Sequence, residues 1–441
     1  MEDHQVSGRE SPRPGIQQEP AEPAAQAIRG RGLQRRHLIF GGAAAGLGAL
    51  AAVGATLAGT TPPKTPQDGT PQNKAVPVSN IPPHGEAIVP FYGARQSGVE
   101  TPPQAHGSFI ALDLKPGTAP DRVRALLRLL SDDAAKLTGG KAALADTEGE
   151  MAVRPARLTV TVGFGPGLVA VVAPAKAPAW LKPLQAFSID RLVPEYCGGD
   201  LLLQICSDDP VTVAHAQRML LKDSRSFATV RWVQQGFRRA HGSDDTGTTM
   251  RNLFGQVDGT ANPGPSSKQF GAVVWGDAAQ PAWTEHGTSL VIRRIRMDLD
   301  KWDGLDRPGR DESIGRRMDN GAPLTGVQEH DEPDFDAVNA AGFPVIADFS
   351  HLRRSRPEDE SQRIYRRPYN YDAVPGAAGV SESGLIFASY QADVDRQFVP
   401  IQQRLDELDL LNEWTTPVGS AVFAIPPGCQ PGGFVGETLF A

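Results

Sequence analysis

The sequence predicts a mixed α+β fold built from two similar halves. Six apolar runs of strand length recur along the chain, three longer helical patterns interleave with them, and two long strands have comparable neighbourhoods on either side of residue 250. The chain has 441 residues, of which 40% are hydrophobic and 22% are charged. It is therefore long enough to bury one large core or two medium ones.

The predicted strands are β-rich, and most of them are bounded by Gly or Pro. In chain order they cover residues 109–114, 158–164, 201–206, 289–297, 385–390 and 420–425. The predicted helices show apolar residues at helical spacing, and they cover residues 121–137, 211–221 and 393–411. Because these helices lie among the strands, the pattern favours an α+β architecture.

Residues 1–58 are set apart as a targeting segment. Arg35 and Arg36 precede the uncharged run 39–58, and this order resembles a twin-arginine signal, which a receptor reads as an export address. An uncleaved membrane anchor is the alternative that the length allows. Residues 59–84 are rich in Pro and Thr, which predicts a linker. We therefore expect an exported protein, periplasmic or extracellular, whose folded halves are residues 85–250 and 251–441.

Charge and cysteine content exclude several classes of protein. Asp and Glu outnumber Lys and Arg by 51 to 44, and no stretch concentrates enough basic charge to follow a phosphate backbone. Nucleic acid is therefore not an expected partner. Cys197, Cys206 and Cys429 form no Cys-x-x-Cys pair, and an odd number cannot form a closed disulfide framework. Zinc-ribbon and thioredoxin-like functions are excluded on this basis.

One short loop has the composition of a ligand-binding turn. Residues 251–263 read Arg-Asn-Leu-Phe-Gly-Gln-Val-Asp-Gly-Thr-Ala-Asn-Pro. Glycine lets the backbone approach a flat ligand closely, although an Asp-Gly pair alone commonly makes an ordinary turn. The Gly-x-x-Asp-Gly spacing, with Asn before it and Thr-x-Asn-Pro after it, resembles the signature of the dye-decolourising (DyP-type) haem peroxidases.

Further blocks in the same order extend this resemblance from about residue 85 onward. They lie at residues 90–93, 158–167, 199–201, 290–300, 321–326, 366–371 and 396–402. Together with the twin-arginine signal, they are similar to the exported deferrochelatase/peroxidase branch of the family. The resemblance implies two ferredoxin-like halves in a dimeric α+β barrel, with haem b held mainly by the C-terminal half.

His351 is the proximal iron ligand that the resemblance implies. It follows the apolar run 343–350, and Asp348 stands three residues before it, as in the family's proximal block. Imidazole is the usual axial ligand of haem. The second ring nitrogen should donate to an acceptor. Asp393 and Asp348 are the two candidates, and the sequence does not choose between them.

On the opposite face of the haem, peroxide chemistry needs a group that moves a proton and a cation that stabilises developing charge. The resemblance gives these roles to Asp258 and Arg366, with Arg367 as the fallback for the cation. It also places other residues against the haem: Gly259, Thr260, Ala261, Arg356, Leu385 and Phe387. The family's Asn-Pro-Arg stretch is Arg356-Pro357-Glu358 here, so the charge at its last position is reversed.

The function implied is that of an exported haem b peroxidase, which uses hydrogen peroxide to oxidise bulky dyes or phenolic donors by one-electron steps. Surface Trp or Tyr residues would relay electrons from donors too large to enter. One alternative is a haem- or iron-handling protein that partners a membrane iron importer, and another is an exported binding protein without a cofactor. The physiological donor and the formation of a homo-oligomer are left open.

Overall fold

The computed structural model describes residues 83–275, 280–376 and 379–441. The predicted export signal and nearly all of the predicted linker lie outside these residues. Among the helices within them, none is long and apolar enough to cross a membrane.

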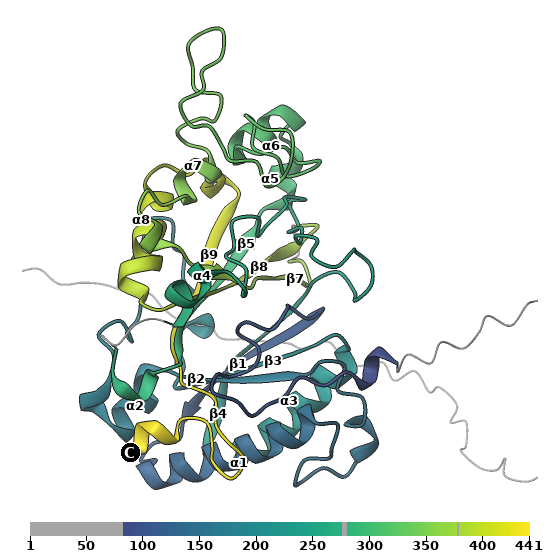
Figure 1. Ribbon diagram of the computed structural model, residues 1–441, viewed down its shortest axis with the longest axis vertical. Helices are drawn as coiled ribbons and strands as arrows, with labels where there is room; N and C mark the ends of the chain where they lie inside the picture. The colour runs from purple at the N-terminus through teal and green to yellow at the C-terminus, as the bar shows by residue number, and fades with distance from the viewer. Residues whose placement is uncertain (1–82, 276–279, 377–378) are drawn as a thin grey trace, which may run out of the picture. The chain divides into compact units, whose positions relative to one another are not determined.

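In the N-terminal half, four antiparallel strands lie in the order β2-β3-β1-β4. Helix α1 connects β1 to β2, α3 connects β3 to β4, and both cover the outer face of this sheet (Figure 1). Helix α3 begins where Asp209 accepts a hydrogen bond from the Thr212 N–H, with Pro210 in its first turn. The elements are β1 (His106–Leu114), α1 (Pro120–Thr138), β2 (Thr159–Phe164), α2 (Pro166–Val172), β3 (Leu201–Ser207), α3 (Pro210–Ser224) and β4 (Ala228–Phe237).

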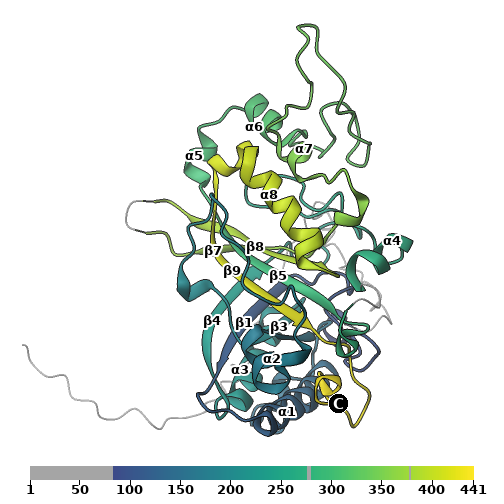
Figure 2. The same cartoon turned by 90° about the vertical axis from the view of Figure 1, so that its left-hand side faces the viewer.

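In the C-terminal half, the strands lie in the order β9-β5-β8-β7, and the short β6 also pairs with β8. Helix α8 lies over this second sheet (Figure 2). The elements are α4 (Lys268–Phe270), β5 (Thr288–Met297), α5 (Leu299–Asp303), α6 (Arg307–Ile314), α7 (His351–Ser355), β6 (Tyr365–Arg366), β7 (Tyr369–Ala373), β8 (Glu382–Gln391), α8 (Val399–Leu408) and β9 (Thr415–Ile425).

Both halves repeat one strand order. The strands of the N-terminal sheet lie side by side as β4-β1-β3-β2, and those of the C-terminal sheet, with β6 set aside, as β9-β5-β8-β7. In both halves the strand that is fourth along the chain lies beside the first, the first beside the third, and the third beside the second. This is the β-α-β-β-α-β arrangement of a ferredoxin-like unit. The two sheets meet through single registered pairs, Phe164 with Ala424 and Phe237 with Asn370. The expected α+β fold with two ferredoxin-like halves is confirmed.

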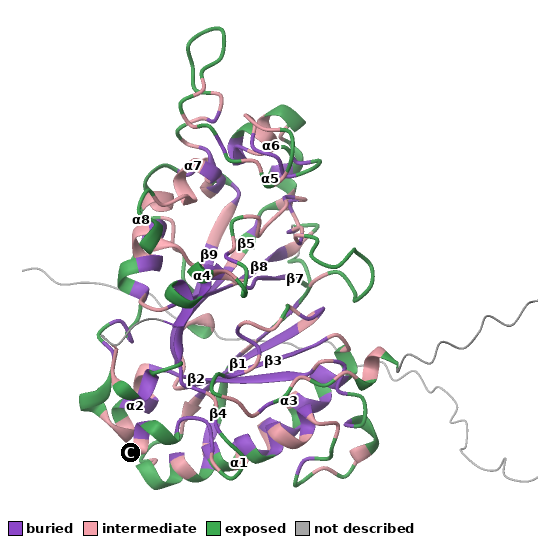
Figure 3. Cartoon of the chain, in the orientation of Figure 1, coloured by how far each residue is buried: buried purple, intermediate pink, exposed green. Residues whose placement is uncertain are grey.

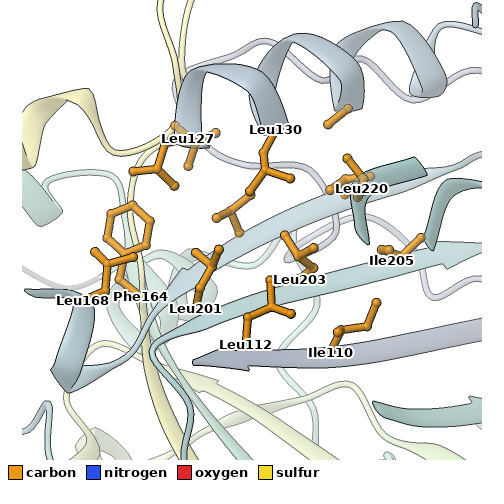
Figure 4. Close-up of a cluster of buried hydrophobic side chains, with 14 of the residues drawn as sticks. Ile110, Leu112, Leu127, Leu130, Phe164, Leu168, Leu201, Leu203, Ile205 and Leu220 are labelled. Carbon is orange, nitrogen blue, oxygen red and sulfur yellow. The ribbon is translucent and has the colours of Figure 1, made fainter. Parts of the chain in front are cut away.

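Most of the strands are buried on both faces because their two faces contribute to different cores (Figure 3). On β1, Ile110 and Leu112 face a core shared with the helices, while Phe109 and Ala111 belong to a core shared with the C-terminal sheet. Alternation along a strand sends neighbouring side chains to opposite faces. Leu127 and Leu130 of α1 complete the helix-facing core (Figure 4). These strands therefore read as continuous apolar runs in the sequence.

The helix predicted at 393–411 differs from the observed structure. The chain forms a π-helical segment at Val394–Phe398, then α8, and then a 3₁₀ turn at Leu410–Glu413. Pro400 has no N–H to donate within a regular helix, so the hydrogen-bond spacing changes just before it. Strands β4, β6 and β7 are additional to those predicted.

The segment after β9 returns to the N-terminal half. The Gln96 Nε2 donates to the Pro426 carbonyl at 2.9 Å, and the Val435 N–H donates to Ser131 Oγ at 3.0 Å. Phe434, Val435 and Leu439 are buried in the helix-facing core of that half. Residues 426–441 therefore follow the C-terminal half in the sequence but pack into the N-terminal half.

Candidate active site

A large pocket in the C-terminal half lies against one face of β5 and β8. The side chains that face it from these strands are in register, Arg293 opposite Phe387 and Ile295 opposite Leu385. Their neighbours Ile292 and Ile386 point to the opposite face and join the core between the sheets. The empty space totals about 1700 Å³, open solvent at the mouth included.

Helices α7 and α8 supply another wall of the pocket. His351 and Leu352 come from α7, and Ile401 and Leu405 come from α8. The Nδ1 of His351 lies 2.6 Å from Asp409 Oδ2. Because Nδ1 donates its proton to this carboxylate, Nε2 is the nitrogen left to bind a ligand.

Asp409 controls the electrostatics of His351. Burial by itself lowers the pKa of this imidazole, but the charge of Asp409 and its hydrogen bond outweigh burial, and the pKa is raised. Asp409 is itself held, because its side chain is only 3% exposed and its Oδ1 accepts the Leu411 N–H at 3.0 Å. The imidazole is therefore fixed in one orientation and made more basic.

The prediction that Asp393 or Asp348 supports His351 is wrong. Asp393 caps the π-helical segment by accepting the Arg396 N–H at 3.0 Å. Asp348 is 69% exposed and lies 3.5 Å from Arg353 Nε. Asp409 was missed because it follows a helical pattern 58 residues after His351, where a carboxylate is typical of a solvated helix end. No sequence signal distinguished it from its acidic neighbours.

The predicted pair of Asp258 and Arg366 is brought together. Arg366 Nη1 lies 2.7 Å from Asp258 Oδ1, and both side chains are largely buried, at 22% and 12% exposure. Both residues line the same pocket as His351. The same pocket therefore holds both an ion pair and a fixed imidazole.

Arg367, the fallback, faces the other way. It follows Arg366 directly, so its side chain points to the opposite face of the strand. There it is fully buried, and it donates to the Thr101 carbonyl and to Gln104 Oε1. The structure therefore gives the pocket cation to Arg366.

Two asparagines of the 251–263 loop hold the ion pair. Asn262 makes two hydrogen bonds to the backbone of Arg366, since Nδ2 donates to its carbonyl at 2.7 Å and Oδ1 accepts its N–H at 3.0 Å. Asn252 Oδ1 accepts the N–H groups of Phe254 and Gln256, which shapes the turn. Gly255 and Gly259 adopt φ values of 84° and 136°, which favour glycine. Neither asparagine was predicted as a positioning residue, although both belong to the motif.

The remaining predicted residues also border the pocket. They are Gly259, Thr260, Ala261, Arg356, Leu385 and Phe387. Arg356 pairs with Glu332, and Thr260 Oγ1 donates to Glu329 Oε1 at 2.9 Å. Arg316, which was not predicted, contributes another guanidinium and donates to the Glu329 carbonyl at 2.8 Å.

These residues fit a haem. The free nitrogen of the fixed His351 would bind the iron, the apolar side chains of the pocket would contact the porphyrin, and Arg316 and Arg356 would hold its propionates. A carboxylate and a guanidinium in the same pocket are the groups that peroxide cleavage requires. Fold and site together define a haem-dependent peroxidase.

Comparison with known proteins gives the family. Residues 96–238 match the model for the N-terminal region of Dyp-type peroxidases, and residues 249–430 match the model for the C-terminal region. The chain belongs to the Dyp-type peroxidase family, and haem is its cofactor.

Three relatives illustrate the likeness. The dye-decolorizing peroxidase of Thermobifida fusca is 38% identical over 78% of this chain and 84% of its own length. The deferrochelatase of Escherichia coli K12 is 35% identical over 77% of this chain and 84% of its own length. The crystal structure of a DyP-type peroxidase from Cellulomonas bogoriensis is 50% identical, with a TM-score of 0.79 over 81% of this chain and 99% of that one.

Proposed function

We propose that this peroxidase oxidises bulky dyes or phenolic donors, one electron at a time, outside the cytoplasm. The observation that carries the chemistry is the Asp258–Arg366 ion pair at 2.7 Å in the pocket that His351 lines. In the overall reaction, one hydrogen peroxide and two protons take two electrons from two donor molecules and give two waters. Bound haem supplies the iron redox chemistry.

The two residues of the pair have separable tasks. Asp258 Oδ1 is engaged by Arg366, whereas Oδ2 has only a 3.4 Å contact with Asn252 Nδ2. Oδ2 is therefore the Asp258 oxygen that takes a proton from one oxygen of peroxide and returns it to the other, which leaves as water. The Arg366 guanidinium stabilises the negative charge that develops as the O–O bond breaks, and it does not titrate.

The fixed imidazole supports this chemistry from another wall of the pocket. Asp409 accepts the Nδ1 proton of His351, which increases the electron density that Nε2 offers to iron. The side chains of Leu385, Phe387 and Leu405 give the pocket apolar walls around these groups. The charges of the ion pair act more strongly there than they would in bulk solvent.

The choice of donor rests on the relatives. The Thermobifida fusca protein is named for dye decolorization. The test is the absorption spectrum of purified protein before and after peroxide, followed by bleaching of an anthraquinone dye and oxidation of a phenol. We expect a Soret band that peroxide alters, and turnover of both donors. A haem-loaded protein that consumes peroxide but oxidises neither donor would contradict the proposed donor class.

Iron handling is the second candidate function, favoured by the likeness to proteins named deferrochelatase. In that case the protein would remove iron from haem and work with a membrane iron importer. Metal-free porphyrin fluoresces, so its appearance from the haem-loaded protein without peroxide would identify this function. A constant haem content under the same conditions would leave peroxidation as the activity.

Export is proposed from the sequence of residues 1–58. Arg35 and Arg36 before the uncharged run are the basis for the twin-arginine route. That route carries folded proteins, which suits a protein that acquires its cofactor before export. The three cysteines are unpaired in the fold, as expected for a chain that folds in a reducing compartment.

A further inference from the structure

Three segments that meet at the edge of the N-terminal sheet bring two imidazoles and a carboxylate together outside the haem pocket. They are His84 near the start of the described chain, Asp208 after β3, and His241 after β4. The nitrogen and oxygen atoms that these side chains offer all lie within 4.8 Å of one another. In the part of the chain that the structure describes, no other group of three or more His, Cys, Asp or Glu side chains is this close.

Asp208 is the fixed member of the cluster. Its side chain is only 4% exposed, and its Oδ1 accepts the Ala105 N–H at 2.9 Å. Its Oδ2 lies 2.8 Å from His84 Nε2 and 3.8 Å from His241 Nδ1. Arg157 Nη1 also approaches Oδ2, at 3.0 Å, and orients the carboxylate from the side.

The two imidazoles are the adjustable members. Their side chains are 36% and 48% exposed, and their rings stack with centroids 3.6 Å apart. A cation bound by both nitrogens requires the rings to turn out of this parallel stack, so that each lone pair points to the ion. Their exposure leaves room for that rotation.

A strained turn at Ala156 and Arg157 fixes the backbone on which two members of the cluster stand. Ala156 and Arg157 are consecutive non-glycine residues with φ of 44° and 61°, a region that such residues rarely occupy. Their N–H groups donate to the carbonyls of Gly85 and Ala87, on either side of Glu86. The carbonyl of Ala156 accepts the Asp208 N–H at 2.9 Å. The turn thus fixes the His84 segment and Asp208 relative to each other, and strain of this kind concentrates at functional sites.

We propose that His84, Asp208 and His241 bind a divalent transition-metal ion of the zinc class. Two imidazole nitrogens and one carboxylate oxygen are ligands that suit Zn²⁺, whereas Mg²⁺ and Ca²⁺ prefer oxygen alone. In a tetrahedral zinc site, neighbouring ligand atoms are about 3.3 Å apart. The two distances to Asp208 Oδ2, 2.8 and 3.8 Å, bracket this value. Water takes the fourth position.

The ion would link three places that are far apart in the sequence. His84 is the last residue of the predicted linker, and His241 lies between β4 and β5, in the connection between the two halves. A bound ion therefore holds the start of the folded region against that connection. This role is separate from the haem pocket and from the peroxidase reaction.

The test uses the full chain loaded with haem, treated with a chelator and then dialysed against Zn²⁺. Zinc bound per protein is measured by elemental analysis across a range of free Zn²⁺, with Mg²⁺ present in excess. We expect one zinc ion bound per protein. His84→Ala and His241→Ala should each weaken the affinity for zinc by about 10–100-fold or more. Binding should also raise the melting temperature of the unsubstituted protein, since the ion binds only the folded state.

The matched control is His286→Asn, which removes an exposed histidine outside the cluster. Residue 286 has φ of 64°, which asparagine tolerates. This variant should bind zinc as the unsubstituted protein does. Haem content and the melting temperature without zinc show whether each variant is folded. If either Ala variant does not fold, His84→Gln or His241→Gln is used in its place. The proposal is overturned if no zinc binds, or if folded His84 and His241 variants bind it with unchanged affinity.

Discussion

The hydrogen bond between His351 and Asp409 decides which nitrogen of the imidazole faces the haem pocket. With Nδ1 held 2.6 Å from the carboxylate, the ring cannot rotate without breaking a buried charge-assisted contact. Such a contact holds a ligand in position before the metal binds.

Replacing His351 by Ala should abolish stable haem binding, because the pocket then has no imidazole to bind the iron. The ratio of Soret absorbance to protein absorbance measures the loss. His330→Ala is the control, since that exposed histidine lies in the same half of the protein and outside the pocket wall. Full haem occupancy with an unchanged spectrum in His351→Ala would show that another residue binds the iron.

Asp258 and Arg366 should give different defects when replaced. Asp258→Asn should keep haem but slow the reaction with peroxide by roughly 10²- to 10⁴-fold, because the proton carrier is lost. The loss should be largest where the Asp258 carboxylate is ionised and smallest in acid, because only the ionised form takes a proton. Arg366→Leu should slow the reaction at every pH, because a guanidinium does not titrate, and it should loosen haem.

Stopped-flow rates across pH distinguish these two outcomes. Wild-type rates in both variants would exclude the ion pair from the chemistry. A wild-type rate in Asp258→Asn alone would show that Arg366 carries the chemistry and that the Asp258 carboxylate only shapes the loop.

At the scale of elements, the 251–263 loop and β6 behave as one unit, because Asn262 binds both backbone groups of Arg366. Asn262→Ala should move the guanidinium relative to Asp258 and slow the reaction with peroxide by about tenfold or more. Haem content and the KM for the donor should stay unchanged. The measurement is the rate with peroxide beside the steady-state constants. Equal losses in haem content and rate would indicate a collapsed pocket instead.

The contact between α1 and α3 predicts how stability depends on pH. Asp223 of α3 is buried near Asp133 of α1, and burial together with that neighbouring charge raises the pKa of Asp223 to about 7. Between pH 4 and 7 the unfolded chain releases this proton while the folded chain keeps it. The free energy of unfolding therefore falls as pH rises through this range.

Asp223→Asn should remove this penalty. We expect stabilisation on the order of 2–4 kcal/mol at pH 8 and little change near pH 4, measured by denaturant unfolding at both values. Asp121→Asn on the exposed side of α1 is the control and should show no such difference. Equal effects of Asp223→Asn at the two pH values would show that its carboxyl does not titrate abnormally.

The sequence predicted the elements that a short stretch of residues identifies by its own pattern of apolar side chains. All six predicted strands form, because burial on both faces gives continuous apolar runs. Strand β4 was missed because only one of its faces is consistently buried, and Arg231, Gln234 and Gln235 make it resemble a polar loop. The Asp409 contact was also out of reach, since it joins residues 58 positions apart. In each case the missing information was which distant segments meet.

At the scale of the whole molecule, the proposed route of export gives a further prediction. Replacing Arg35 and Arg36 by Lys should leave folded, haem-loaded protein in the cytoplasm, because the receptor reads both arginines. Cell fractionation followed by haem staining measures the distribution. Substituting Arg29 and Arg31 by Lys, upstream of the pair, is the control and should not alter it. Unchanged export of the paired variant would contradict the twin-arginine route.

The position of β9 also determines when this protein is able to fold. Strand β9 pairs with β5 more than 100 residues earlier and meets β2 at Phe164, and the segment after it fills the core beneath α1. The ribosome must therefore release residues 415–440 before the N-terminal core is complete or the second sheet has all its strands. Contacts of such long sequence separation form slowly. Completion of both halves is consequently a late step of folding, and a chain whose synthesis stops before residue 415 leaves apolar surface exposed in both halves at once.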